Sequence, residues 1–249
     1  MVARLKLTVA YDGAPFSGWQ SQPNGNAIQD HLEHAFEHIF SERVGVHGAG
    51  RTDAGVHALA QVAHADLPVR RYSAERWRSA LNGVLPPGIR IMRCTFVSES
   101  FHARFTAKGK VYRYRIWNGD VASPLENGRV WHVRGMLDRD ALTKTAKLFV
   151  GRHDFCSFAA NRGVVVTDTV RTIRRVRVQN SGPLTSIEIE GDGFLYKMVR
   201  MMVGSLVQVG LGKASADLIR ACLAQNGRSF ALSRTVAPAA GLFLIRVRY

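Results

Sequence analysis

Apolar and polar residues alternate along the first stretch of the chain, residues 5–11, where every second position is apolar and Asp12 and Gly13 end the pattern. This period of two is that of a β-strand with one buried face. Across residues 28–39 the apolar positions recur every three or four residues, as on one face of an α-helix, and Asn26 is the expected N-cap. The pattern therefore predicts a strand followed by a helix.

Two strand-like runs follow, at about residues 43–49 and 56–66, on either side of the glycine-rich stretch GAGRTDAGVHALAQ. A helix with Ser73 as its N-cap and Gly83 as its stop comes next, and residues 90–97 have the pattern of another strand. The order strand, helix, strand, strand, helix, strand is the ferredoxin-like βαββαβ motif.

The same order begins again in the second half of the chain, at Lys110. The expected strands are 110–117, 170–178, 186–190 and 241–249, and the expected helices are 138–151 with Asp138 as N-cap, 194–209 and 215–225. Residues 152–168 have weak periodicity and are expected to loop over the surface. We predict an α+β protein with two ferredoxin-like (βαββαβ, RRM-like) halves, 1–105 and 106–249, whose antiparallel sheets pack side by side around a basic cleft.

Charge narrows the range of partners. The 249 residues include 34 Lys and Arg against 19 Asp and Glu, a formal net charge of +15, and 46% are apolar. This charge favours a polyanionic partner, nucleic acid rather than a membrane surface. The alternative is that the basic side chains are only solvated at the surface and bind no partner. Because no run of 18 apolar residues exists and the first residues become strand-like too early for a signal peptide, we expect a cytoplasmic protein without a membrane span.

Metal binding is not expected. The three cysteines, Cys94, Cys156 and Cys222, form no C-x-x-C pair and suit a reducing compartment. His57 and His64 share a predicted strand, but at an odd spacing they face opposite sides of it. We therefore expect no metal site.

Asp53 is the first candidate for chemistry, at the tip of the predicted connection between two strands. Gly48, Gly50 and Gly55 allow positive φ angles and the close approach of another backbone or a ligand. One interpretation is a turn residue that pairs with its neighbour Arg51. The other is a nucleophile directed at a sugar or base, because a carboxylate in a basic groove does not favour phosphate binding.

Two aromatic and basic stretches are candidates for RNA contacts. Tyr112 shares a strand face with Tyr114 and Ile116, which we assign to the core, but Tyr112 itself lies near two lysines and could stack on a base or accept a proton. The run FHARFTAKGK, which begins at Phe101, mixes aromatic and basic groups suited to RNA backbone and bases.

The predicted helix 194–209 is apolar on nearly all sides but is interrupted by Lys197 and Arg200 on one face. A cation in such a helix needs an anionic partner or must reach the floor of the cleft. Asp53 is the expected partner of Arg200.

Six motifs together resemble the TruA family of tRNA pseudouridine synthases along essentially the whole chain. They are YDGAPFSGWQ, GAGRTDAGVHALAQVAHAD, FHARF, KVYRYRIWN, FLYKMVRMMVG and GLFLIRVRY. GRTDAGVHA is the most specific of them.

The resemblance implies an isomerase that converts uridine to pseudouridine at positions 38, 39 and 40 of the tRNA anticodon stem-loop, without cofactor or metal, as a homodimer. Asp53 then matches the catalytic aspartate, Arg51 the base-flipping arginine and Tyr112 the tyrosine that packs on the target uracil. Arg200 would lie near the substrate, and the half 106–249 would complete the cleft and the dimer.

The resemblance also implies a set of tRNA contacts: Arg71, Phe101, His102, Ala103, Arg104, Phe105, Val165, Val166, Thr167, Asp168 and Thr169. Two departures from the family pattern stand out. Tyr196 and Lys197 replace smaller or polar residues before MVR, and the stretch 165–169 is largely apolar with an acid, Asp168.

The main alternative is a non-catalytic RRM-like RNA-binding protein, because βαββαβ is also the order of the RRM fold. Its signature is matched only loosely by KGKVYRYRI. The two hypotheses diverge at Asp53, since a binder would tolerate Asp53→Asn whereas an enzyme would lose turnover.

Overall fold

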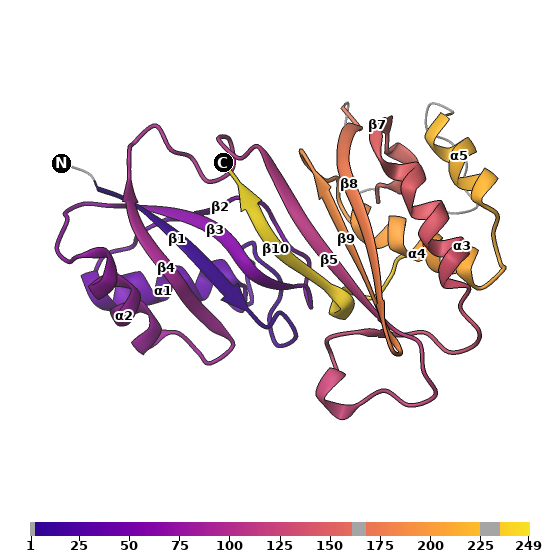
Figure 1. Cartoon of the computed structure of the whole chain (residues 1–249). Coiled ribbons are helices and arrows are strands. Elements are labelled where there is room, and N and C mark those ends of the chain that lie inside the picture. The colour runs from indigo at the N-terminus through magenta and orange to yellow at the C-terminus, as the bar shows by residue number, and fades with distance from the viewer. Residues whose placement is uncertain (1–2, 161–167, 225–234) are drawn as a thin grey trace. The chain divides into compact units, whose positions relative to one another are not determined.

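The computed structural model describes residues 3–160, 168–224 and 235–249 (Figure 1). The chain divides into two compact units, unit 1 with Met1–Lys108 and Phe243–Tyr249, and unit 2 with Gly109–Leu242. The last strand therefore lies in unit 1, whereas the sequence pattern placed it with the second half. The fold is mixed α+β with mostly antiparallel strands.

Unit 1 has the predicted order of its first six elements. They are β1 (Ala3–Tyr11), α1 (Ile28–Phe40), β2 (Val46–Gly48), β3 (His57–Leu67), α2 (Ala74–Val84) and β4 (Ile89–Val97), and β10 (Leu242–Arg248) is added from the end of the chain. Strand β1 lies between β3 and β4, antiparallel to both. Strand β3 pairs with β2 near one end and, in parallel, with β10 near the other.

The helices α1 and α2 lie together on one face of the unit 1 sheet (Figure 1). The alternation in β1 places Leu5, Leu7 and Val9 in the core with no exposed surface. Trp77 of α2 is also fully buried, with its ring 5.6 Å from that of Phe36 in α1. This burial of alternate strand residues beneath two amphipathic helices is what the hydrophobic period predicted.

Helix boundaries in unit 1 differ from the sequence prediction at two of three signals. Ser73 caps α2 as expected, by accepting from the Arg76 amide. Asn26 does not cap α1: the cap is Ala27, whose amide donates to the Asp30 carboxylate, while the Asn26 side chain donates to the Pro15 carbonyl. Gly83 does not stop α2 either, because the helix continues to Val84.

Unit 2 consists of a sheet with helices on one side (Figure 1). Its elements are β5 (Gly109–Trp117), β6 (Trp131–His132), α3 (Arg139–Ala146), β7 (Gly151–Asp154), β8 (Val170–Ser181), β9 (Leu184–Gly191), α4 (Met198–Gly210) and α5 (Ala216–Ala224). The pairing order is β5-β9-β8-β7, all antiparallel, and β6 lies parallel to β5. Short 3-10 turns cover Pro124–Glu126, Lys147–Phe149, Cys156–Phe158 and Ala239–Gly241.

Two expectations for unit 2 are wrong in detail. Residues 152–168 were expected to form only a surface loop, but β7 and a 3-10 turn occupy part of this segment and bury Phe155 and Phe158. The helix expected from residue 194 begins at Met198, because Lys197 has a left-handed backbone with φ of 58°. Asp138 caps α3 as predicted, by accepting from two backbone amides.

Candidate functional site

Asp53 lies in the loop between β2 and β3, residues 49–56, which we call the Asp53 loop. The Asp53 carbonyl accepts a hydrogen bond from the Val56 amide at 3.1 Å and closes a turn, in which Gly55 has a φ of 78°. Asp53 is half-buried, Thr52 before it is buried and Arg51 is exposed. The loop-tip position predicted for Asp53 is confirmed.

The segment from Tyr11 to Trp19 supports the Asp53 loop through its backbone. The Trp19 amide donates to the Thr52 carbonyl at 3.0 Å. Gly18 has a φ of 94°, and a Cβ there would lie 2.7 Å from the Thr52 carbonyl oxygen. Only glycine therefore permits this approach of the two backbones. Gly48 has a related role, since a Cβ on it would lie 2.4 Å from the Trp19 ring.

A largely buried polar network supports the part of the loop that precedes Asp53. The Tyr11 hydroxyl lies 2.8 Å from Thr52 Oγ1, and Gln61 Nε2 donates to the Gly50 carbonyl at 2.8 Å. Gln61 has no exposed surface. Burial raises the pKa of Tyr11, so its phenol stays neutral. Sequence reasoning missed these three residues, although a Gln at a fully buried strand position was a detectable signal.

His57 lies directly after the Asp53 loop and is 2% exposed. Its Nδ1 is 3.1 Å from both Asp12 Oδ1 and the Gly13 amide nitrogen, and its ring stacks on Phe243 with 4.5 Å between centroids. His64 lies farther along β3 among other aromatic rings. Among the described residues, no group of three or more His, Cys, Asp or Glu could hold a metal ion.

Arg51 is oriented by a neighbouring segment. Its Nε donates to Gln20 Oε1 at 2.9 Å, and Gln20 is itself linked to Gln29 in α1. The guanidinium is exposed two positions before Asp53. It is therefore held on the same surface loop as the carboxylate while remaining accessible to a ligand.

Tyr112 and Arg200 lie in unit 2, whereas Asp53 lies in unit 1. Tyr112 is 7% exposed, shares its strand face with the buried Tyr114 and Ile116 as predicted, and meets Phe194 edge to face at 5.1 Å. Arg200 lies in the first turn of α4, half-buried, and its Nε donates to the Ala237 carbonyl at 2.7 Å. The pairing of Arg200 with Asp53 stays a prediction.

The residues expected to contact tRNA near 165–169 are only partly described. Val165, Val166 and Thr167 lie outside the described residues. Asp168 is exposed, accepts from the Val170 amide and lies 3.5 Å from an Arg171 guanidinium nitrogen. Thr169 donates to Asp154 at 2.6 Å. The acid at 168 is thus partly neutralised by an adjacent arginine.

The segment Phe101–Phe105 follows β4 and has a mixed exposure. Phe105 is 76% exposed and Arg104 is exposed, with the guanidinium carbon of Arg104 5.6 Å from the centre of the Phe105 ring. Ala103 between them and the strand has no exposed surface. The segment therefore presents an aromatic and a basic side chain next to a residue that is buried.

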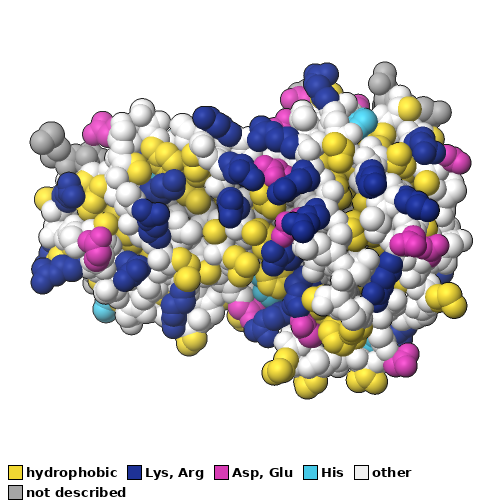
Figure 2. Space-filling model, viewed as in Figure 1, with side chains coloured by type: hydrophobic (Ala, Val, Ile, Leu, Met, Phe, Trp, Pro, Cys, Tyr) yellow, Lys and Arg dark blue, Asp and Glu magenta, His cyan; other side chains and the backbone are white. Residues whose placement is uncertain are grey.

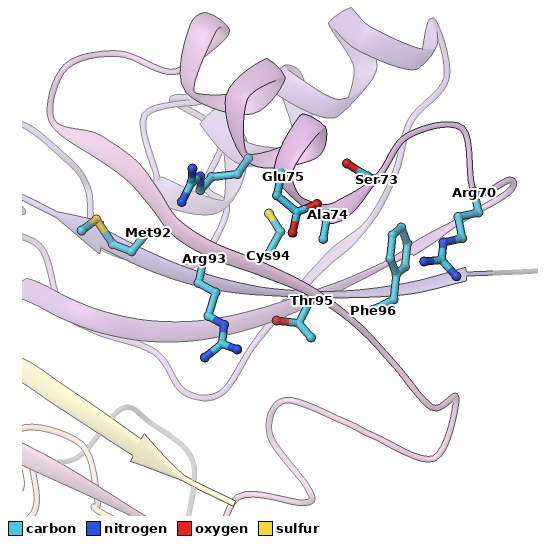
Figure 3. Close-up of a pocket in the computed structure, with 10 residues that line it drawn as sticks. Arg70, Ser73, Ala74, Glu75, Met92, Arg93, Cys94, Thr95 and Phe96 are labelled. Carbon is cyan, nitrogen blue, oxygen red and sulfur yellow. The ribbon is translucent and has the colours of Figure 1, made fainter.

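Arg71 is exposed, and Arg70, which precedes it in the sequence, lines a basic hollow of about 620 Å³ between α2 and β4 (Figure 3). Arginines at 70, 78 and 93 line it, together with Glu75 and Phe96, and no residue of the Asp53 loop does. On the face of the molecule in Figure 2, Lys and Arg side chains are widely spread and Asp and Glu are fewer. None of the helices in the described parts of the chain is long and apolar enough to cross a membrane.

A family sequence model and individual relatives, compared with the chain, point to the same family. The sequence model of a family described as tRNA pseudouridine synthase matches residues 7–106 and 145–249. Proteins named tRNA pseudouridine synthase A from Akkermansia muciniphila and Methylacidiphilum infernorum are 44% and 41% identical to the chain, and each match covers 100% of it and 96% of the relative. A solved chain from a Cbf5-Nop10-Gar1 complex aligns with a TM-score of 0.37 and 12% identity over 82% of this chain and 45% of that one, which is too distant to support an argument.

Proposed function

The chain belongs to the tRNA pseudouridine synthase A family, an isomerase family, and on this premise we propose that it converts uridine to pseudouridine at positions 38, 39 and 40 of the tRNA anticodon stem-loop. The observation that supports this most is the placement of Asp53, the residue that matches the family aspartate, at the tip of a loop in which the preceding residues Gly50 and Thr52 are held by hydrogen bonds.

The reaction breaks the bond between N1 of uracil and C1′ of ribose and forms a bond between C5 and C1′. C5 loses a proton and N1 gains one, so the step is balanced without an oxidant, reductant or co-substrate. We assign Asp53 as the nucleophile that attacks C1′, with removal of a proton from C2′ as the alternative route. Either route requires the carboxylate to contact the ribose, which suits a residue at a loop tip.

Arg51 and Tyr112 have complementary roles in this proposal. Unstacking the target nucleotide costs about a few kcal/mol, and Arg51 would offset part of that cost by filling the gap it leaves. The orientation of its guanidinium by Gln20 supports this role. Tyr112 would pack on the extruded uracil, and its edge contact with Phe194 fixes the ring for stacking. Arg200 would bind the substrate beside Asp53.

The wider tRNA surface consists, in this proposal, of Arg71, the segment Phe101–Phe105 and residues 165–169. The net charge of +15 supports binding to a polyanion. We further propose that the two units are ferredoxin-like halves around a basic cleft, that the protein acts as a cytoplasmic homodimer, and that one tRNA contacts both protomers.

The test is Asp53→Asn, which keeps the size of the side chain and removes its charge. Bulk unmodified tRNA is incubated with each protein, and pseudouridine is mapped by position. We expect the wild type to modify positions 38–40 and the variant to lose turnover by about 10⁴-fold or more while binding tRNA at least as tightly. Pseudouridine formed at the wild-type rate by the variant would contradict the role of Asp53. A wild-type protein that binds tRNA without forming pseudouridine would favour the RRM-like binder.

A further inference from the structure

The backbone of the segment Phe101–Phe105 is held by two imidazole rings. The Ala103 amide donates to Nδ1 of His64 in β3 at 3.2 Å. The amides of Arg104 and Phe105 both donate to Nδ1 of His102, at 3.1 and 3.3 Å. Three consecutive amides of this segment therefore depend on two histidine nitrogens that carry no proton.

The carbonyl groups of the same segment are also occupied. The Tyr249 hydroxyl donates to the Ala103 carbonyl at 2.7 Å, so Ala103 is held from both sides. Arg4 of β1 donates to the Phe101 carbonyl at 2.8 Å and also to the Glu99 carbonyl. Asp66 fixes that guanidinium through two hydrogen bonds of 2.6 and 2.7 Å. Partners from β1, β3 and the segment after β10 therefore converge on one short loop.

The side chains that remain outside this arrangement suit contact with RNA. The Phe105 ring is 76% exposed and packs on the His102 ring with 4.3 Å between centroids. Such a ring is available to stack on a base, and the exposed Arg104 beside it is available to a phosphate.

We propose that His64, His102 and Tyr249 are positioning residues that hold Phe101–Phe105 as a preformed tRNA platform, so that Phe105 and Arg104 need no ordering when tRNA binds. This inference rests on the proposed function, because it assumes that the segment contacts tRNA. Preorganisation raises affinity by removing the entropic cost of fixing a loop at the moment of binding. His64 and Tyr249 act through the backbone of the segment, and His102 lies within it.

Burial and the charges around the two imidazoles favour the neutral ring, which is needed to accept a hydrogen bond at Nδ1. Burial above all, together with Arg4, His102 and His47, lowers the pKa of His64 to about 4, and Asp66 opposes this shift. Burial, with His47, Arg4 and Arg104, also lowers the pKa of His102, again opposed by Asp66. Both rings are therefore neutral near pH 7, and each Nδ1 is free of a proton and able to accept.

The sharpest test is Tyr249→Phe, which removes one oxygen atom and keeps the ring that lies 4.3 Å from Lys6 Nζ. Its matched control is Tyr114→Phe, because the Tyr114 hydroxyl also donates to a backbone carbonyl, that of Pro238, at 2.7 Å, but in unit 2. We expect Tyr249→Phe to raise the KM for tRNA about fivefold with the single-turnover rate at saturating tRNA unchanged. Tyr114→Phe should leave the KM unchanged.

His64 provides a second pair of variants. Asn at this position keeps an acceptor near the place of Nδ1, whereas His64→Leu removes it. We expect His64→Leu to raise the KM for tRNA at least as much as Tyr249→Phe, and His64→Asn to restore most of the loss. Where His64→Leu does not fold, Tyr249→Phe decides alone. A wild-type KM in Tyr249→Phe, or an equal rise in Tyr114→Phe, would overturn the proposal.

Phe105→Ala separates this inference from the proposed function. We expect it to raise the KM for tRNA in the same way as Tyr249→Phe, and an unchanged KM would show that the segment is not a tRNA platform. If the proposed function itself were wrong, the result would differ, because wild-type protein would form no pseudouridine in any tRNA.

Discussion

Two loops of unit 1 are proposed to contact tRNA, and they are held in place by different chemistry. The Asp53 loop is supported by uncharged groups, the Tyr11 phenol, the Thr52 hydroxyl and the Gln61 amide. The segment Phe101–Phe105 is supported by two imidazoles and by an arginine that is paired with Asp66. The first set is largely buried whereas the second is partly exposed, and only the second contains imidazoles, which titrate in the acidic range.

The difference is informative about what each loop must do. A loop that presents a catalytic carboxylate requires a geometry that does not change with pH, and hydroxyl and amide hydrogen bonds provide that. A loop that presents an aromatic ring and an arginine tolerates a support that weakens in acid. We therefore expect acid to affect tRNA affinity before it affects the position of Asp53.

The largest expected effect comes from breaking the backbone support of the Asp53 loop with Gly18→Ala. The new Cβ would lie 2.7 Å from the Thr52 carbonyl oxygen, at a φ of 94° that L-residues rarely adopt. We expect a loss of about 2 kcal/mol or more in the free energy of unfolding, and a fall in single-turnover rate of about 100-fold.

Gly25→Ala is the control for this prediction. Gly25 also has a positive φ, 64°, but a Cβ there meets no atom within 4 Å. It should cost only the backbone strain and leave the single-turnover rate unchanged. Equal rates for the two variants would show that the close approach at Gly18 does not position Asp53.

An intermediate effect, on the free energy of unfolding, is expected when the pH is lowered. The folded-state pKa of His64 is about 4, below its ordinary value of 6.5, so the unfolded chain binds the proton more readily. This difference costs no stability above pH 6.5, and the free energy of unfolding falls as the pH is lowered from 6.5 toward 4. Denaturant unfolding at several pH values measures it.

His64→Asn sharpens this prediction because it keeps an acceptor but cannot titrate. Its free energy of unfolding should fall less steeply than that of the wild type between pH 6.5 and 4. Parallel curves for the two proteins would show that His64 does not cause the acid sensitivity.

The smallest effect is expected from Tyr11→Phe, which removes the hydroxyl that lies 2.8 Å from Thr52 Oγ1. The loss of a buried hydrogen bond should cost about 1 kcal/mol in the free energy of unfolding. If this network positions Asp53, the single-turnover rate falls a few-fold and the KM for tRNA does not change, the opposite of Tyr249→Phe. A change in KM alone would remove the contrast between the two loops.

Local patterns predicted much of the fold. The period of two in residues 5–11, the helical period in 28–39 and the caps at Ser73 and Asp138 are all found in the structure. These signals are local, because they depend on which face of one element is buried and on one side chain near a helix end. The loop-tip position of Asp53 followed from the same reasoning.

The supports of the two loops could not be predicted in this way. The Tyr11 and Thr52 hydroxyls are separated by 41 positions in sequence, and Tyr249 and Ala103 by 146. Neither pair has a local signature, and each polar group alone resembles an ordinary strand or loop residue. The start of α4 was missed for a related reason, since the left-handed turn at Lys197 occurs within a run that is helical by composition.

Strand β3 sets the distance between one support of the Asp53 loop and one support of the segment Phe101–Phe105. Gln61 and His64 are three residues apart on it, and their partners in β1 are Val9 and Lys6. At a rise of about 3.3 Å per residue, their backbone positions are about 10 Å apart, a separation set by covalent geometry rather than by side-chain packing. Removing one residue between them would shorten this distance and turn one of the two side chains to the opposite face of the sheet. The length of this short segment is thus a fixed dimension of the protein.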